Sequence, residues 1–256
     1  MALLIPREHG AYGQLLMPLA VALVIGGATA GALALGTAAA CAFLAHEGLL
    51  VLLGQRGGRA SRELRSAARR SLLLFGTVAI VAGCVAVAIL PTRARFALSV
   101  PVAFALVAAS LVASGRERTT SGEVIVTLTL TSISFPVVVA GGIGAQAAAT
   151  VVAAFAAAFV SATVAVRAVI AHATRSPHGP GRALAATIVA LLIFALIATA
   201  VFGVVAPVSI WAVTPACAFA LVLLATTPSP RHLRRIGWTL VGTTAAAAVV
   251  LIVALR

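Results

Sequence analysis

An arginine, a glutamate and a histidine stand together at the start of the chain, directly before its first long apolar segment. Arg7, Glu8 and His9 are followed closely by Tyr12 and Gln14. A guanidinium binds phosphate or carboxylate groups, and a carboxylate beside an imidazole can exchange protons with a substrate. We interpret this run as the mouth of a cavity, with Glu8 and His9 as candidate catalytic residues and Arg7, Tyr12 and Gln14 as candidate substrate-binding residues. The alternative is a surface ion pair beside an interfacial tyrosine.

A second titratable pair, His46 and Glu47, lies inside an apolar stretch, about 10–15 Å of helix before the next arginine, Arg56. A carboxylate at that depth in a membrane costs free energy unless a cation or a shared proton compensates it. We predict that the compensating partner is Arg7, Arg167 or one of the loop arginines, and we treat His46 and Glu47 as candidate catalytic residues. A purely structural pair is the alternative.

Two further charged groups occur between apolar segments. Arg116, Arg118 and Glu123 stand between the fourth and fifth segments, and Arg167 and His172 stand near the end of the sixth. Arg167 has no carboxylate close in sequence, so it either extends to the membrane interface or points into the protein toward an anion. We expect all five residues to contribute to substrate binding at the rim of the cavity. For the first group, a solvated and capped turn is the alternative.

The elements that position these residues follow from composition. Of the 256 residues, 62% are hydrophobic and 9% are charged, and the mean hydropathy is +1.17. Soluble domains average about 45–50% apolar and about 25% charged residues. The cations are all arginine and the carboxylates are all glutamate. This composition predicts an integral membrane protein and excludes Schiff-base chemistry on lysine and metal sites built from aspartate.

Cutting the chain at charges, prolines and glycine clusters leaves apolar segments of about 20 residues, the length that crosses a bilayer as a helix. They predict an all-α, polytopic helical bundle with about nine transmembrane helices, in which residues 1–256 form a single transmembrane domain. The expected spans are 13–31, 33–53, 71–90, 96–114, 123–142, 146–171, 183–203, 206–226 and 237–255.

The arginines predict the orientation, because arginine-rich loops stay on the cytoplasmic side. With a cytoplasmic N-terminus and an outside C-terminus, only Arg93, Arg95 and Arg256 lie outside, and the other fifteen arginines lie inside. All candidate site residues then fall on the cytoplasmic half, which favours a pocket open to the cytoplasm. The expected cytoplasmic loops lie near 54–70, 115–122, 172–182 and 228–236.

The run from Pro6 to Gly13, continuing through Gln14 to Pro18, resembles the start of the YwiC-like family of bacterial membrane proteins. This resemblance implies a multi-pass protein of the bacterial inner (plasma) membrane. A weaker resemblance is to the UbiA superfamily of intramembrane prenyltransferases, which also have nine spans, cytoplasmic active sites and long cytoplasmic loops after the second and sixth spans. Arg7 and Pro18 match its entrance pattern, and 54–70 and 172–182 occupy the two loop positions.

The UbiA-like resemblance implies an enzyme that acts on an isoprenoid (diphosphate) or a similar anionic lipid, by prenyl transfer or by terpene-type cyclisation. That superfamily holds Mg²⁺ with two aspartate-rich motifs, which this chain lacks. Glu47 and Glu63 are the only carboxylates near the first motif position. The cofactor therefore stays unknown: Mg²⁺ stays open but has no support from aspartate-rich motifs, and without it an anionic head group would be held mainly by arginine.

Two other functions stay open on the sequence. Neutral imidazoles suit a metal or haem centre, for which His9, His46 and His172 are the candidate ligands, although their spacing matches no known motif. The third reading is a non-enzymatic membrane scaffold or small-solute transporter whose charges serve topology alone. As partners we expect membrane lipids and an isoprenoid or other lipid-like small molecule, and no nucleic acid.

Overall fold

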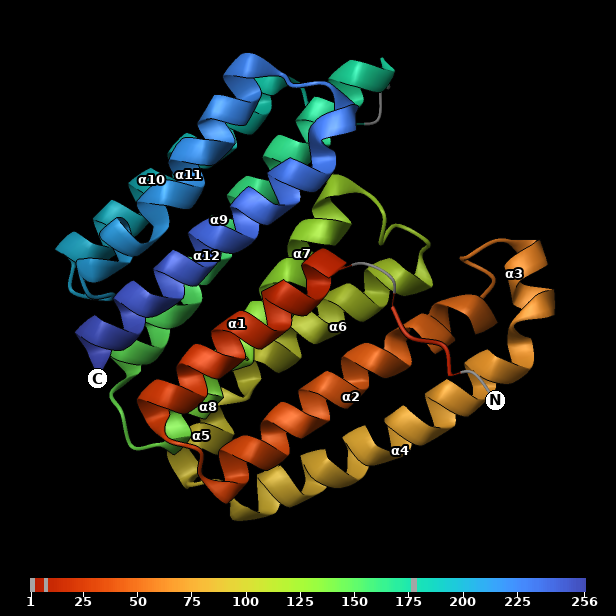
Figure 1. The fold of residues 1–256 in the computed structure, drawn as a ribbon. Coiled ribbons are helices and arrows are strands. Elements are labelled where there is room, and N and C mark those ends of the chain that lie inside the picture. The colour runs from red at the N-terminus through yellow and green to blue at the C-terminus, as the bar shows by residue number, and fades with distance from the viewer. Residues whose placement is uncertain (1–2, 7–8, 176–178) are drawn as a thin grey trace.

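The computed structural model describes residues 3–6, 9–175 and 179–256, apart from the side chains of residues 9 and 230. Within these residues the chain forms helices and connecting loops, without strands, and long helices run side by side in alternating directions (Figure 1). The elements are α1 (His9–Gly26), α2 (Ala30–Leu52), α3 (Gly58–Glu63), α4 (Arg65–Ile89), α5 (Thr92–Ala97), α6 (Ser99–Ala113), α7 (Thr120–Ser132), α8 (Ser134–Ala140), α9 (Ala145–Thr174), α10 (Arg182–Val201), α11 (Val208–Thr226), the 3₁₀ turn η1 (Pro230–His232) and α12 (Leu233–Leu255).

The number and the length of its apolar helices identify the protein as a multi-pass membrane protein. In the described part of the chain, eight stretches are long and apolar enough to cross a bilayer, and α1 adds a shorter apolar helix over Gly10–Gly26. Large apolar side chains point away from the protein, among them Ile80 on α4, which is 69% exposed, and Phe194 on α10, also 69% exposed. Such faces are stable against lipid. The prediction of an all-α bundle with about nine spans is confirmed.

Two of the spans are broken helices, and proline explains both breaks. Pro101 cannot donate a backbone hydrogen bond to residue 97, and Pro136 cannot donate one to residue 132. Accordingly α5 ends at Ala97, four residues before the first proline, and α7 ends at Ser132, four residues before the second. Each pair of helices together makes one apolar stretch, Thr92–Ala113 and Thr120–Ala140.

Several expected boundaries were wrong, mostly because the sequence was cut at charged residues. The first helix begins at His9 and not at residue 13, so Tyr12 and Gln14 lie on α1 itself. The expected loop 54–70 is largely helical, because α3 and the first turns of α4 occupy it. Arginine is a good helix former, so an arginine-rich segment continues a helix readily.

Glycines allow the helices to approach closely at two places. A Cβ atom on Gly141, after α8, would lie 1.6 Å from the carbonyl oxygen of Gly26 at the end of α1. A Cβ atom on Gly48 of α2 would lie 2.7 Å from the carbonyl oxygen of Ala68 on α4. Lipid supplies no hydrophobic driving force for helix association, so close contacts between small residues stabilise the packing of the helices instead.

The arginines lie mainly at one end of the bundle, which we call the basic end. It comprises the start of α1, α3, the loop between α6 and α7, and the starts of α10 and α12; the C-terminus lies at the opposite end (Figure 1). At the opposite end the described arginines are Arg93, Arg95 and Arg256. The basic end carries Arg56, Arg59, Arg62, Arg65, Arg69, Arg70, Arg116, Arg118, Arg167, Arg175, Arg182, Arg231, Arg234 and Arg235.

Candidate functional site

A tight loop between α6 and α7 places charged side chains at the basic end. The Thr119 hydroxyl caps α7 by accepting a hydrogen bond from the Gly122 N–H at 3.1 Å. Gly122 has no room for a side chain, since a Cβ atom there would lie 2.2 Å from the carbonyl oxygen of Glu117. The loop therefore folds back over the first turn of α7 and holds Glu117 at the surface of the bundle.

Glu117 binds His46 of α2. The His46 Nε2 and Glu117 Oε1 atoms lie 2.7 Å apart, and the two side chains are 30% and 17% exposed. Burial raises the pKa of Glu117, but the hydrogen bond and positive charge of His46, with the charges of Arg56 and Arg118, more than offset it. The pKa of this carboxyl therefore lies below its ordinary value.

Glu47, the neighbour of His46 on α2, is neutralised by Arg56 from the following loop. The guanidinium binds both carboxylate oxygens, and its Nε lies 2.9 Å from Glu47 Oε1. Both side chains are mostly buried. The prediction that a loop arginine compensates Glu47 is confirmed in this structure, and this two-point geometry fixes the positions of both side chains.

A third ion pair joins α7 to α9. Arg167 donates from Nε to Glu123 Oε2 at 2.6 Å and from Nη2 to the other carboxylate oxygen. The Nη2 atom also donates to the backbone carbonyl of Arg118. Glu123 lies in the first turn of α7, where the helix dipole stabilises a negative charge. Of the two expected arrangements for Arg167, the structure shows the one that points toward an anion, and that anion is Glu123.

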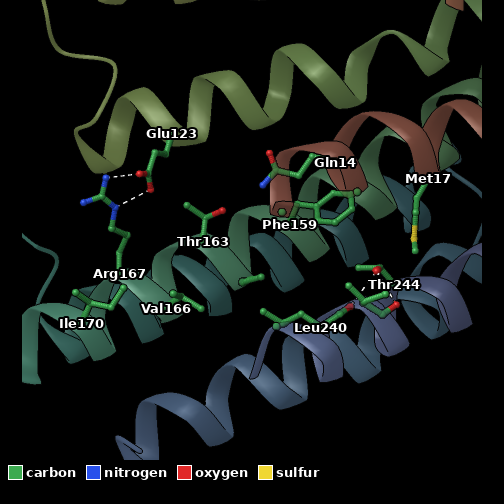
Figure 2. Close-up of a pocket in the computed structure, with 15 residues that line it drawn as sticks. Gln14, Met17, Glu123, Phe159, Thr163, Val166, Arg167, Ile170, Leu240 and Thr244 are labelled. Carbon is green, nitrogen blue, oxygen red and sulfur yellow. Dashed lines mark hydrogen bonds and ion pairs between the residues drawn. The ribbon is translucent and has the colours of Figure 1, made fainter. Parts of the chain in front are cut away.

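This third pair lies at one end of a cavity of about 490 Å³, which we call the central cavity. Figure 2 shows the dashed bonds between Arg167 and Glu123 at one end, Gln14 and Thr163 further in, and Met17 toward the other end. The two charged side chains therefore lie at the basic end, beside Val166 and Ile170, and the lining away from that end is uncharged. The lining residues come from α1, α7, α9 and α12: Gly10, Gly13, Gln14, Met17, Glu123, Phe159, Ala162, Thr163, Val166, Arg167, Ile170, Gly237, Leu240, Val241 and Thr244.

A smaller cavity of about 200 Å³, the polar cavity, adjoins the central one. The two cavities share Gly10, Gln14, Glu123 and Thr163 in their linings. Gln14 also accepts a hydrogen bond from the Thr127 hydroxyl at 3.3 Å. The polar cavity is lined by two arginines and two glutamates, so the formal charges of its lining residues balance. Its lining is Gly10, Ala11, Gln14, Arg56, Glu117, Arg118, Glu123, Val126, Thr127 and Thr163.

The structure brings some of the predicted site residues together. Gln14, Glu123 and Arg167 line the central cavity, and Arg118 lines the polar cavity. The predicted catalytic residues His46 and Glu47 are absent from both linings within the described chain. They bind Glu117 and Arg56, which do line the polar cavity.

Other predicted residues lie apart from the two cavities. The Tyr12 hydroxyl donates to the carbonyl of Pro6 at 3.0 Å, and its ring packs edge-on against Phe43. Arg116 is exposed in the α6–α7 loop. His172 lines a different cavity, beside Arg175 and Arg182. The remaining three predictions lie outside the described residues: Arg7, Glu8 and the side chain of His9.

Sequence reasoning missed several lining residues. Glu117 stands between two arginines in the sequence, and this spacing is a signal for a compensated carboxylate, because a nearby cation favours the charged form. Thr163 and Phe159 of α9 and Leu240 of α12 carried none, since hydroxyl and apolar residues occur throughout the spans.

The fold and the site define a polytopic helical membrane protein with a mostly apolar cavity that has its charged side chains at the arginine-rich end. The chain belongs to the YwiC-like protein family, whose sequence model matches residues 5–139. The match covers α1 to α7 and nearly all of α8, and therefore includes Gln14, Glu117 and Glu123 but not Arg167. No curated protein and no solved structure matches the chain.

Proposed function

We propose that the central cavity binds an isoprenoid or similar lipid-like amphiphile, with its head at the Arg167–Glu123 end and its tail among Met17, Phe159 and Leu240. The observation that carries the proposal is that the two charged side chains lie at one end of a cavity whose other lining residues are uncharged and mostly apolar. Apolar pockets with a few convergent polar groups are the usual form of small-molecule sites.

The enzymatic form of this proposal is a UbiA-like prenyl transferase or cyclase. Glu8, His9, His46 and Glu47 are its proposed acid–base groups, and Arg7, Arg118 and Arg167 its proposed anion-binding groups. In support, His46 is hydrogen-bonded to Glu117, which lines the polar cavity next to the proposed head-group position. In such a reaction the proton that the substrate loses or gains would pass through Glu117, and the His46 imidazole would take it up or return it.

A two-motif Mg²⁺ clamp does not fit these residues. Among the described residues, no three His, Cys, Asp or Glu side chains group together in a way that could hold a metal ion. The four described carboxylates are instead each bonded to a cationic or imidazole side chain. A metal or haem function therefore gains no support from the described residues.

We further propose that the chain is a single transmembrane domain of the bacterial inner membrane, with its basic end in the cytoplasm. The distribution of arginine supports this orientation. The head of the bound amphiphile would then be accessible from the cytoplasm.

The experiment is mass spectrometry of lipids that co-purify with the full chain. Gly13 lines the central cavity, and a Cβ atom added there would meet nothing within 4 Å, so Gly13→Leu inserts a side chain into open space. Gly242→Leu is the matched control, because Gly242 lies on α12, is exposed, and also has nothing within 4 Å of a Cβ.

We expect an amphiphile that is enriched over bulk lipid in the wild type and in Gly242→Leu, and lost in Gly13→Leu. Both changes replace glycine by a better helix former, so neither should weaken its helix. Equal lipid content in all three proteins would contradict the proposal and favour the scaffold or transporter reading.

A further inference from the structure

Two uncharged polar side chains of the central cavity have hydrogen-bond donors that no described residue accepts. The Gln14 amide oxygen accepts from Thr127, but its nitrogen donates to no described residue. The Thr163 hydroxyl makes no hydrogen bond within the described chain either, whereas Thr127 and Thr244 donate to carbonyls of their own helices. A ligand that displaces water from these donors must offer them acceptor atoms, because an unsatisfied donor costs free energy.

Gln14 and Thr163 lie on two walls of the central cavity, at the place where it meets the polar cavity. Gln14 belongs to α1 and Thr163 to α9, and both residues line both cavities. In Figure 2 the amide nitrogen of Gln14 lies on the side of that residue toward Thr163. Phe159 and Arg167 lie about one helical turn before and after Thr163 on the same side of α9. The two donors are therefore positioned between an ion pair and an aromatic ring.

The charges near these donors do not favour an anionic head group. In the described lining of the central cavity, the two charged residues are Arg167 and Glu123, which are bonded to each other. The polar cavity adds Arg56, Arg118 and Glu117, and together with Glu123 these charges also balance. A phosphate or carboxylate would therefore gain little net attraction, and it would lie close to the Glu123 carboxylate. An uncharged oxygen atom meets no such repulsion.

We propose that the amphiphile of the central cavity has an uncharged oxygen, a hydroxyl or a carbonyl, as its head group. The Gln14 amide and the Thr163 hydroxyl donate to this oxygen, and the tail lies along Phe159 and Met17. The inference rests on the function proposed above and specifies the head group. Of the two enzymatic forms it favours cyclisation, because prenyl transfer needs a diphosphate leaving group at that position. Isoprenoid alcohols and aldehydes have the required chemistry.

The test compares four ligands with one isoprenoid chain: farnesol, farnesal, farnesyl diphosphate and the hydrocarbon farnesene. Each is titrated against the full chain in detergent and followed by native mass spectrometry. We compare the wild type with Gln14→Leu/Thr163→Val, which removes both donors at similar side-chain size, and with Thr163→Ser, which keeps the hydroxyl. Thr187→Val is the matched control, because Thr187 is exposed on α10 and lines neither cavity. Thermal unfolding of each variant verifies that it folds.

We expect farnesol and farnesal to bind the wild type more tightly than farnesyl diphosphate and farnesene. The double variant should lose roughly tenfold in farnesol binding and bind farnesene as the wild type does. Thr163→Ser and Thr187→Val should stay near the wild type.

Two results would overturn this inference and leave the proposed function standing. One is tighter binding of farnesyl diphosphate than of farnesol, and the other is unchanged farnesol binding in the double variant. The Gly13→Leu variant described above separates the two levels, because it inserts a side chain into the cavity. Farnesol binding that Gly13→Leu leaves unchanged would overturn the proposed function of the cavity itself.

Discussion

The Nε2 atom of His46 lies 2.7 Å from Glu117 Oε1, although 71 residues separate the two in the chain. This contact joins α2 to the α6–α7 loop, and the same loop contacts Arg167 of α9 through the carbonyl of Arg118. The loop therefore bridges the two sides of the polar cavity. We therefore expect the cavity wall to respond to pH and to single substitutions at these charged contacts.

Acid should weaken the bridge at Glu117. The pKa of this carboxyl in the folded protein lies below its ordinary value of 4.5. The group therefore stabilises the fold fully above that value, and the contribution is lost as the pH falls through the lower, folded-state pKa. We expect Glu117→Gln to unfold at a lower temperature than wild type at neutral pH, with the gap closing in acid.

Thermal unfolding in detergent from about pH 7 down to about pH 3 measures this gap. Glu63→Gln serves as the control, because its ion pair with Arg59 is exposed and should contribute only about 0–1 kcal/mol. A gap between wild type and Glu117→Gln that does not change with pH would refute the prediction.

The pair between Arg167 and Glu123 should show strong coupling. Replacing either one alone leaves a partly buried charge without its partner, so Arg167→Gln and Glu123→Gln should each destabilise the protein. The double variant should be less destabilised than the sum of the two. We expect a coupling free energy of about 0.5–3 kcal/mol in a double-mutant cycle. Additive single effects would mean that the pair contributes nothing beyond its separate residues.

Packing between α2 and α4 should tolerate a methyl group at one glycine and not at another. Gly48→Ala places a Cβ atom 2.7 Å from the Ala68 carbonyl oxygen, whereas Gly83→Ala places one 3.9 Å from the Ala38 Cβ. We expect the first change to cost about 1–3 kcal/mol of unfolding free energy. The second should be neutral, or stabilising by up to about 1 kcal/mol. Denaturant titration of both variants checks the difference, and equal stabilities would show that α2 and α4 separate freely.

The proposed orientation predicts which loops react from outside the cell. In a chain whose three cysteines are replaced by alanine, Ser114→Cys labels the α6–α7 loop and Val204→Cys labels the turn before α11. A membrane-impermeant maleimide should label position 204 in intact cells and position 114 only after permeabilisation. The reverse pattern would invert the topology and place the polar cavity outside.

The sequence was sufficient for the architecture because apolar length and arginine position are local signals. Arg231 and Arg235 could be placed at the same end as Arg56 by counting spans alone. The partner of Glu47 was also within reach, since Arg56 follows it by nine residues. The end at which each arginine lies follows from the order of the spans, and the Glu47–Arg56 pair involves only one span and its adjoining loop.

The site could be predicted only in part, because its contacts join distant elements. Nothing local indicates that His46 would meet Glu117, or that Arg167 would select Glu123 across 44 residues. The α12 wall of the central cavity was missed for a related reason. Leu240 and Thr244 are ordinary membrane-helix residues, and only the packing of α12 beside α1 and α9 gives them a cavity to line.

The contact between Gly26 and Gly141 has a mechanical consequence. Backbone touches backbone there, at the end of the bundle opposite the arginines, so α1 and the end of α8 have no side chains between them that could rearrange. The central cavity begins near the other end of α1. We therefore expect entry of a long-chain molecule to tilt α1 away from its neighbours about the Gly26–Gly141 contact. The opening should be widest beside the charged loops.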